Sequence, residues 1–155
     1  MSFLTHTPIE ADAFVQTRAR PTSGARVLFF GVCRGDSDGR RVLYLEYEAF
    51  EPVADARFKK ILEEAFARWS LVDIQIQHRL GRVCTGEIAV AIAVETAHRA
   101  ESYEASRFLI EQIKHRVPIW KKEFFEDGTS EWVLGCHYDE LHHSDKKSSR
   151  SFETA

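Results

Sequence analysis

Alternation of apolar and polar residues along the chain predicts six β-strands. They are expected at 26–33, 42–50, 72–83, 86–95, 119–125 and 131–136. In the second of these, Leu43, Leu45 and Tyr47 alternate with Tyr44, Glu46 and Glu48, which indicates one buried and one exposed face. The fourth is an almost unbroken apolar run and is expected to be covered on both faces. The last two flank the sequence EDGTS, which is a hairpin signal.

Two longer segments have the three- and four-residue spacing of apolar positions that is typical of amphipathic helices. The first is expected at 53–69, where Pro52 fits the first turn. The second is expected at 100–116 and ends before Pro118. Strands and helices together follow the order β, β, α, β, β, α, β, β. This order predicts an α+β domain with a mixed, largely antiparallel sheet and two main helices.

A single domain is expected over residues 1–140, because 155 residues are an ordinary length for one hydrophobic core. The chain is 44% hydrophobic and 29% charged, as in ordinary globular proteins. Its net charge of -3 provides no basic field of the kind that nucleic-acid binding requires, so an anion site must be local. Residues 141–155 are polar and lack periodicity, which predicts a flexible C-terminal tail.

Cysteine and histidine usage argues against a disulfide framework and against a metal site. The three cysteines are odd in number and have no CxxC spacing, which fits a reducing cytoplasm. Cys33, beside Arg34, is a weak candidate nucleophile because no histidine base is recognisable near it. The histidines within 137–143 lack cysteine partners, so neither a metal nor a cofactor is expected. The N-terminus has no signal-peptide pattern and the apolar run 88–94 is too short to cross a bilayer, so we expect a cytoplasmic protein without membrane contact.

Two lysines bracket the join between the second helix and the strand that follows it. Lys114 lies near the end of the helix, Pro118 turns the chain, and Lys121 follows in the strand. Two ammonium groups from adjoining elements can point into one pocket, which suits an anionic substrate and nucleophilic or proton-transfer chemistry. Strand alternation places Lys121 and Lys122 on opposite faces, and we expect Lys121 to be the one that joins Lys114. The alternative for Lys114 is a solvated lysine, which the helix macrodipole favours at any helix C-terminus.

Three further residues, in two other segments, are candidates for binding an anion. His98 and Arg99 open the second helix, where a cation opposes the macrodipole unless an anion is bound nearby. The alternative is that Glu101 and Glu104 in the same turn neutralise Arg99. Arg34 ends the first strand, where it is either a solvated loop residue or a further cation of the same site.

The segments that carry these residues resemble, in the same order, the large catalytic subunit of molybdopterin synthase, the MoaE family. The segments are FFGVCR, LEYEAF, HRLGRVCTGEIAVAIAV, AHRAESYEASRF and KHRVPIWKKE. The similarity covers about residues 25–135, and the combination of segments is specific to the family. The resemblance implies an α/β hammerhead-type fold, which agrees with the mixed order of elements predicted above.

The resemblance also implies an activity. Members of this family transfer sulfur to cyclic pyranopterin monophosphate and form the dithiolene that later holds molybdenum. The sulfur arrives as a thiocarboxylate on the C-terminal Gly-Gly of a small ubiquitin-like subunit. Two large subunits form a central homodimer with a small subunit at each end, so the chain is expected to be the sulfurtransferase subunit of a heterotetramer, without a cofactor of its own.

Carried over by motif, the resemblance implies roles for six residues. Lys114 and Lys121 correspond to the active-site lysines, and the candidates for substrate binding are Arg34, His98, Arg99 and, in the segment PIWKKE, Lys122. The chain departs from the family after Arg34, where it has the acidic sequence GDSD. An alternative function is a non-catalytic module that binds a ubiquitin-like partner, but such a module has no need of a cationic pocket. RNA binding is disfavoured by the net charge and by the lack of an aromatic and basic RNA-binding motif.

Overall fold

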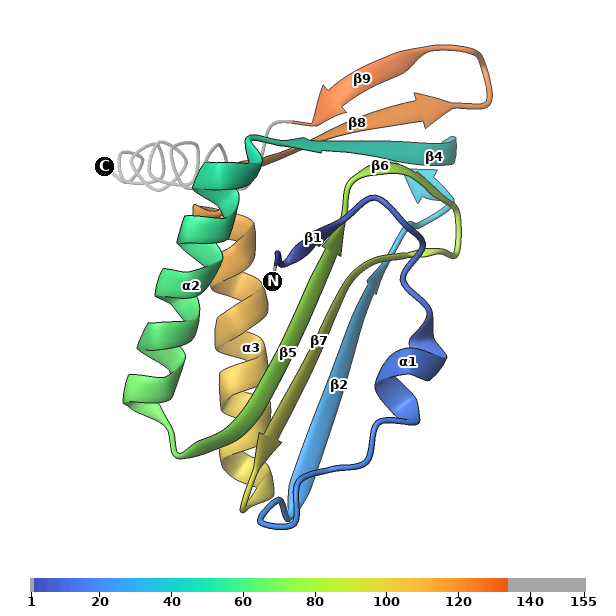
Figure 1. Cartoon of the computed structure of the whole chain (residues 1–155). Coiled ribbons are helices and arrows are strands. Elements are labelled where there is room, and N and C mark those ends of the chain that lie inside the picture. The colour runs from blue at the N-terminus through green and yellow to red at the C-terminus, as the bar shows by residue number, and fades with distance from the viewer. Residues whose placement is uncertain (1, 134–155) are drawn as a thin grey trace, which may run out of the picture.

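Two β-sheets and three helices make up the computed structural model, which describes residues 2–133 (Figure 1). The helices are α1 (Ala11–Val15), α2 (Glu51–Arg68) and α3 (Arg99–Arg116). The strands are β1 (Leu4–Thr5), β2 (Ala25–Val32), β3 (Asp36–Ser37), β4 (Arg40–Ala49), β5 (Leu71–Arg79), β6 (Gly81–Cys84), β7 (Ile88–Thr96), β8 (Ile119–Phe125) and β9 (Ser130–Val133). The predicted order of the main strands and both predicted long helices are present. No helix within this part of the chain is long and apolar enough to cross a membrane.

The first sheet has the strand order β1-β5-β7-β2 and carries helices on both faces. Strand β7 is antiparallel to both of its neighbours, whereas the short β1 runs parallel to β5. Figure 1 shows α2 and α3 side by side on one face and α1 on the other. Val90, Ile92 and Val94 of β7 belong to the core under the long helices, while Ala91 and Ala93 pack with the N-terminal segment. The prediction that this strand is covered on both faces is therefore confirmed.

The second sheet is built around β4, which pairs with β3, β6 and β8, while β9 forms the edge beyond β8. The predicted hairpin at EDGTS is the β8–β9 turn, where Gly128 has a φ of 85° that favours glycine. Its outer strand was expected to reach residue 136, and residues 134–136 lie outside the described part. The predicted tail, 141–155, lies outside it as well.

Two strand predictions need correction. The strand expected over 72–83 is two strands in different sheets, because Gly81 adopts a φ of 81° and redirects the chain between them. In β4, Leu43 is 44% exposed and Val42 is buried instead, because the pairing with β8 shifts register between Val42 and Tyr44. Leu45 and Tyr47 are buried as expected. The short elements β1, α1 and β3 have too few residues for a periodic pattern and were not predicted.

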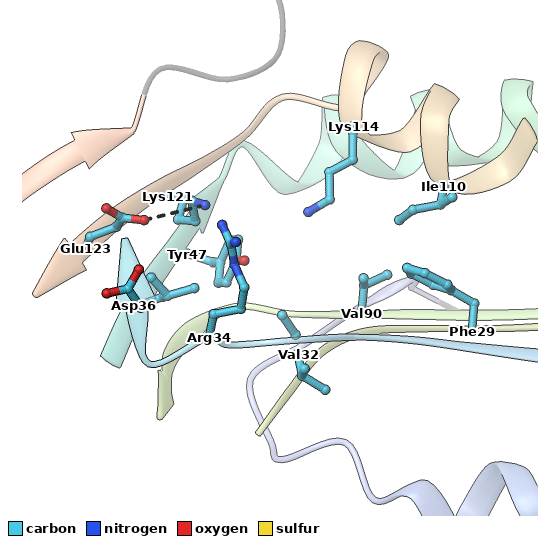
Figure 2. Close-up of a pocket in the computed structure, with 13 residues that line it drawn as sticks. Phe29, Val32, Arg34, Asp36, Tyr47, Val90, Ile110, Lys114, Lys121 and Glu123 are labelled. Carbon is cyan, nitrogen blue, oxygen red and sulfur yellow. Dashed lines mark ion pairs between the residues drawn. The ribbon is translucent and has the colours of Figure 1, made fainter. Parts of the chain in front are cut away.

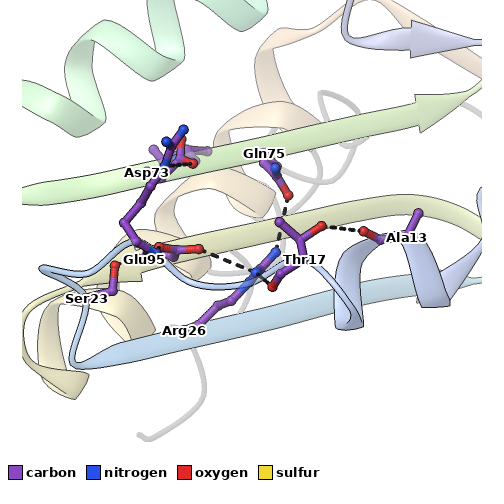
Figure 3. A network of polar contacts seen from close by, with 9 residues as sticks. Ala13, Thr17, Ser23, Arg26, Asp73, Gln75 and Glu95 are labelled. Atoms are coloured by element: carbon purple, nitrogen blue, oxygen red, sulfur yellow. Dashed lines mark hydrogen bonds and ion pairs between the residues drawn. The ribbon is translucent and has the colours of Figure 1, made fainter.

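A buried polar network fixes the loop before β2 to the end of β7 (Figure 3). The Glu95 carboxylate accepts a hydrogen bond from Oγ of Ser23 at 2.6 Å and another from the backbone N–H of Arg20 at 2.8 Å. Nη1 of Arg26 lies 3.4 Å from the other carboxylate oxygen and also donates to the carbonyl of Thr17. The next residue, Thr96, accepts a bond from the backbone N–H of Gly24. The network therefore positions the point at which the chain leaves the sheet to begin α3.

Candidate functional site

A cavity of about 220 Å³ lies between the two sheets and the C-terminal end of α3. It has a charged end and an apolar end, and Figure 2 shows the side chains of both. The apolar end is formed by Phe29, Val90 and Ile110. The charged end holds three cationic and two acidic side chains, which are Arg34, Lys114, Lys121, Asp36 and Glu123. This arrangement gives a locally positive site in a chain whose net charge is -3.

Lys114 reaches the cavity from the last turn of α3. It lies four residues after Ile110, so both side chains project from the same face of the helix. Its Nζ is 5.9 Å from the centre of the Tyr47 ring, within the range of a cation–π contact. The helix holds Lys114 in place because the neighbouring Ile113 is only 2% exposed and belongs to the core. Lys114 is exposed to solvent, as the solvated alternative expects, but its side chain also lines the cavity and contacts the Tyr47 ring.

Lys121 enters the same cavity from β8. Its Nζ lies 3.8 Å from Oε1 of Glu123, two residues further along the strand and hence on the same face. The prediction that Lys121 rather than Lys122 joins Lys114 is confirmed. Lys122, which was also named as a candidate for substrate binding, does not line the cavity of its own chain. Alternation turns its side chain to the opposite face, where Nζ lies 5.4 Å from the ring of Trp132.

Arg34 lies two residues after the end of β2 and directs its guanidinium toward the two lysines (Figure 2). Asp36, in the loop sequence that departs from the family pattern, lines the same end of the cavity. Arg34 comes from a segment about 80 residues before the one that carries Lys114 and Lys121. Their convergence supports an anion site, since both arginine and lysine bind carboxylates and phosphates through charge-assisted hydrogen bonds.

His98 and Arg99 lie at the opposite end of α3 and do not line this cavity. Both are exposed, and His98 is the N-cap residue of the helix while Arg99 is its first residue. Arg99 and Lys114 are 15 positions apart, or about 22 Å along the helix axis at 1.5 Å per residue. Within one chain, His98 and Arg99 therefore do not lie beside Lys114 and Lys121.

A family model described as MoaE protein matches residues 4–116. The chain belongs to the MoaE family. It is 45% identical over 126 residues to the molybdopterin synthase catalytic subunit of Halalkalibacterium halodurans, covering 81% of this chain and 80% of that protein. The crystal structure of molybdopterin synthase from Staphylococcus aureus superposes with a TM-score of 0.79 at 37% identity, covering 86% of this chain and 96% of that one.

A further structural match is a complex of subunits 1 and 2 of molybdopterin-converting factor from Helicobacter pylori. It has a TM-score of 0.69 over 84% of this chain and 88% of that one, and at 21% identity the likeness concerns the fold alone. These matches confirm the predicted MoaE family and the mixed α+β fold. Lys114 lies inside the range that the family model matches, whereas Lys121 lies five positions beyond its end.

Sequence reasoning missed three residues of this MoaE-family site, namely Asp36, Tyr47 and Glu123. Glu123 could have been predicted from the sequence, because it lies two residues after Lys121 and therefore on the same strand face. Tyr47 was predicted to be buried, but its place beside the lysines depends on its pairing with Lys121 across β4 and β8. Burial raises the pKa of Tyr47 to about 12, so its hydroxyl stays protonated at neutral pH.

The described residues support neither a nucleophilic role for Cys33 nor a metal site. Cys33 is 2% exposed, and burial raises the pKa of its thiol although Thr85 and Lys121 act in the opposite direction. Since the thiolate is the nucleophilic form, Cys33 is poorly suited to that role. Among residues 2–133, no group of three or more histidines, cysteines and carboxylates could hold a metal ion. The histidines within 137–143 lie outside this range.

Proposed function

We propose that this chain is the catalytic subunit of a molybdopterin synthase, a sulfurtransferase of molybdenum cofactor biosynthesis. Its reaction takes sulfur from the thiocarboxylated C-terminus of a small ubiquitin-like subunit and adds it to cyclic pyranopterin monophosphate. The observation that carries the proposal is the convergence of Lys114 and Lys121 on one cavity in a chain of the MoaE family. The names of the relatives support the same activity.

The charged end of the cavity suits both reactants, since a thiocarboxylate and a cyclic phosphate are each anionic. Arg34 provides a planar, permanently charged group for the phosphate or the terminal carboxylate. Lys114 is assigned the position beside the thiocarboxylate carbonyl, and Lys121 the handling of substrate charge and protons. Each partner subunit gives up its sulfur and recovers a carboxylate with an oxygen from water. Two such transfers supply the two sulfurs of the dithiolene.

The partner is proposed to be a small subunit whose C-terminal tail enters the cavity. The two-subunit complex from Helicobacter pylori, which shares this fold, supports such a pairing. The apolar and charged ends of the cavity match a tail with a small, flexible Gly-Gly terminus and an anionic end. A non-catalytic module that only binds such a partner would leave the paired lysines without a function. The reaction is proposed to take place in the cytoplasm.

The substrate-binding role of His98 and Arg99 leads to a proposal about assembly. About 22 Å of helix separates Arg99 from Lys114, so Arg99 can act beside a Lys114 only if that lysine belongs to another chain. We therefore propose a homodimer in which each chain supplies His98 and Arg99 to the cavity of its partner. A small subunit bound to each copy completes a heterotetramer.

The experiment mixes the purified chain with a thiocarboxylated small subunit and the pterin precursor, and measures dithiolene formation by mass spectrometry. Lys114→Ala is expected to lose nearly all turnover while it keeps the wild-type circular dichroism spectrum. Lys122→Ala is expected to keep most of its turnover, because Lys122 does not line this cavity. Wild-type protein that forms no product would refute the activity, and an active Lys114→Ala variant would refute the role of that lysine.

The shared cavity is tested by mixing two inactive variants, Lys114→Ala and Arg99→Ala. Each mixed dimer then has one cavity with an intact Lys114 and an intact Arg99 from the other chain. Random pairing at equal amounts should restore about a quarter of the wild-type turnover, because C2 symmetry gives two equivalent sites in each dimer. If Arg99 acted within its own chain, mixing would restore nothing, and if it had no part in the reaction, Arg99→Ala alone would keep its turnover.

A further inference from the structure

Tyr47 stands between the two lysines of the cavity. On β4 it is the direct partner of Lys121 on β8, and the centre of its ring is 5.9 Å from Nζ of Lys114. It lines the cavity although it is only 7% exposed. The face of an aromatic ring attracts an ammonium group within about 6 Å, and the attraction grows as water is excluded. The ring thus gives the Lys114 ammonium a defined contact surface beside Lys121.

His78 packs against the same tyrosine and is among the most buried polar residues described. It is 1% exposed, and its ring meets that of Tyr47 edge to face, with centroids 5.0 Å apart and planes at 77°. Its Nδ1 lies 2.9 Å from the carbonyl oxygen of Arg79, so Nδ1 carries a hydrogen and donates it. Burial first, and then the charge of Lys114, lower the pKa of His78 to about 4. A neutral imidazole can therefore fix the tyrosine ring without repelling the lysine.

We propose that Tyr47, held in place by His78, is a positioning residue that fixes the Lys114 ammonium beside Lys121 in the sulfur-transfer site. This inference rests on the proposed function. The ring rather than the hydroxyl performs the task, since the hydroxyl stays protonated and adds no negative charge to attract the lysine. The other charged groups at this end of the cavity are Arg34, Asp36 and Glu123, and none of them provides an aromatic face.

The inference predicts a specific pattern among three variants. Tyr47→Phe keeps the ring, and Tyr47→Met fills much of the same space without an aromatic face. Tyr44→Met is the matched control, because Tyr44 is also on β4 but stacks on Phe124 at 4.5 Å and does not line the cavity.

We expect kcat of Tyr47→Met to fall by on the order of 10- to 100-fold, the size of effect that a misplacement of about 1 Å produces. Its KM for the thiocarboxylated partner should stay near the wild-type value, and the other two variants should keep most of their kcat. Thermal unfolding of each variant checks that it is folded. Wild-type kcat in Tyr47→Met would overturn the proposal, and an equal loss in Tyr47→Phe would assign the role to the hydroxyl instead.

A second measurement uses the wild-type protein without any reactant. The ε-methylene protons of Lys114, assigned in NMR spectra by comparison with Lys114→Arg, should show nuclear Overhauser contacts to the Tyr47 ring and an upfield ring-current shift. Tyr47→Phe should keep the upfield shift and Tyr47→Met should lose it. Absence of the contact in the wild-type protein would overturn the proposal even if no variant folds. An inactive wild type that shows the contact would instead refute the proposed function and leave the Tyr47 contact standing.

Discussion

Replacement of Glu95 by glutamine tests the buried network at the end of β7 (Figure 3). The Glu95 side chain is 5% exposed and that of Arg26 is 13% exposed, so neither charge is well solvated. Glutamine has the same shape as glutamate but lacks the charge. Its amide oxygen can still accept from Ser23 and from the backbone of Arg20, but its NH₂ group then faces the donor Nη1 of Arg26. The reverse orientation loses the first two bonds instead.

The expected loss in the free energy of unfolding follows from the charge of Arg26, which stays buried after Glu95 is replaced. Removing one partner of a buried ion pair costs about 3–5 kcal/mol, because the remaining charge is left without compensation. Arg26 already has a buried Nε without a hydrogen-bond partner, so it has little means of compensating. Because Arg26 keeps its bonds to Thr17 and Gln75, we expect the lower end of this range, about 3 kcal/mol at pH 7. That is a large part of the total stability of a domain of this size, about 5–15 kcal/mol.

Urea unfolding followed by circular dichroism measures this difference. The matched control is Glu126→Gln, which breaks an exposed pair with Arg41, whose side chains are 59% and 72% exposed. Exposed pairs contribute about 0–1 kcal/mol, so the control should be close to wild type. A Glu95→Gln variant within about 1 kcal/mol of wild type would refute the reasoning, because its loss would then equal that of a solvated pair.

The pH dependence provides a second check on Glu95. Burial alone would raise the pKa of this carboxyl, but the hydrogen bonds from Ser23 and Arg20 and the charge of Arg26 outweigh it and lower the pKa. The unfolded value is about 4.3. The stabilisation is therefore complete above that pH and is lost as the pH falls through the lower folded value. The difference between wild type and Glu95→Gln should shrink below about pH 4, and a constant difference would contradict this account.

Three other predictions follow from the fold. Gly24→Ala places a Cβ 2.1 Å from the carbonyl oxygen of Ala97, so we expect a loss of about 1–3 kcal/mol in urea unfolding. Wild-type stability would mean that this loop is not held against the sheet. Phe14→Ala uncovers the second face of β7, and since Phe14 is 6% exposed we expect a loss of about 3–5 kcal/mol. A loss below about 1 kcal/mol would show that α1 is not part of the core. The pKa of His78, lowered to about 4 by burial and Lys114, lies below the unfolded value of about 6.5, so the stability from the neutral ring is lost as the pH falls between them. Wild type should lose about 3 kcal/mol more than His78→Gln between pH 7 and pH 4, and equal losses would contradict this.

The elements of this fold could be predicted because their signals are local. Alternation and helical spacing are set by neighbours in sequence, so both long helices and most strands were expected near their observed positions. The division into two sheets was not predictable in the same way. It depends on the bend at Gly81 and on pairings such as β4 with β8, which join residues far apart in the chain. The register shift that exposes Leu43 has the same long-range origin.

The residues of the candidate site also differ in whether local sequence or long-range pairing determines their position. Lys114 and Lys121 are close in sequence, so a helix, a turn and strand alternation sufficed to predict that they meet. The position of Tyr47 beside them required knowledge of which strands pair. Arg34 was named as a cation at the end of a predicted element and again through the family resemblance, and the fold then brings it to the lysines. His98 and Arg99 were named in the same way, yet the fold holds them at the far end of α3.

Helix α3 therefore holds Lys114 at a fixed separation from His98 and Arg99. Its C-terminal end presents Lys114 to a cavity of its own chain, and its N-terminal end begins where the Glu95 network fixes the end of β7. In a two-fold symmetric pair, each helix would then join one cavity to the other. Disturbing either end should affect the same reaction, but in different ways. Loss of the Tyr47 contact is expected to misplace Lys114 within its own cavity and to lower kcat. In the proposed homodimer, a shifted start of α3 is expected to misplace His98 and Arg99 in the neighbouring cavity. A Glu95→Gln dimer that is still folded should therefore show a higher KM for the pterin substrate.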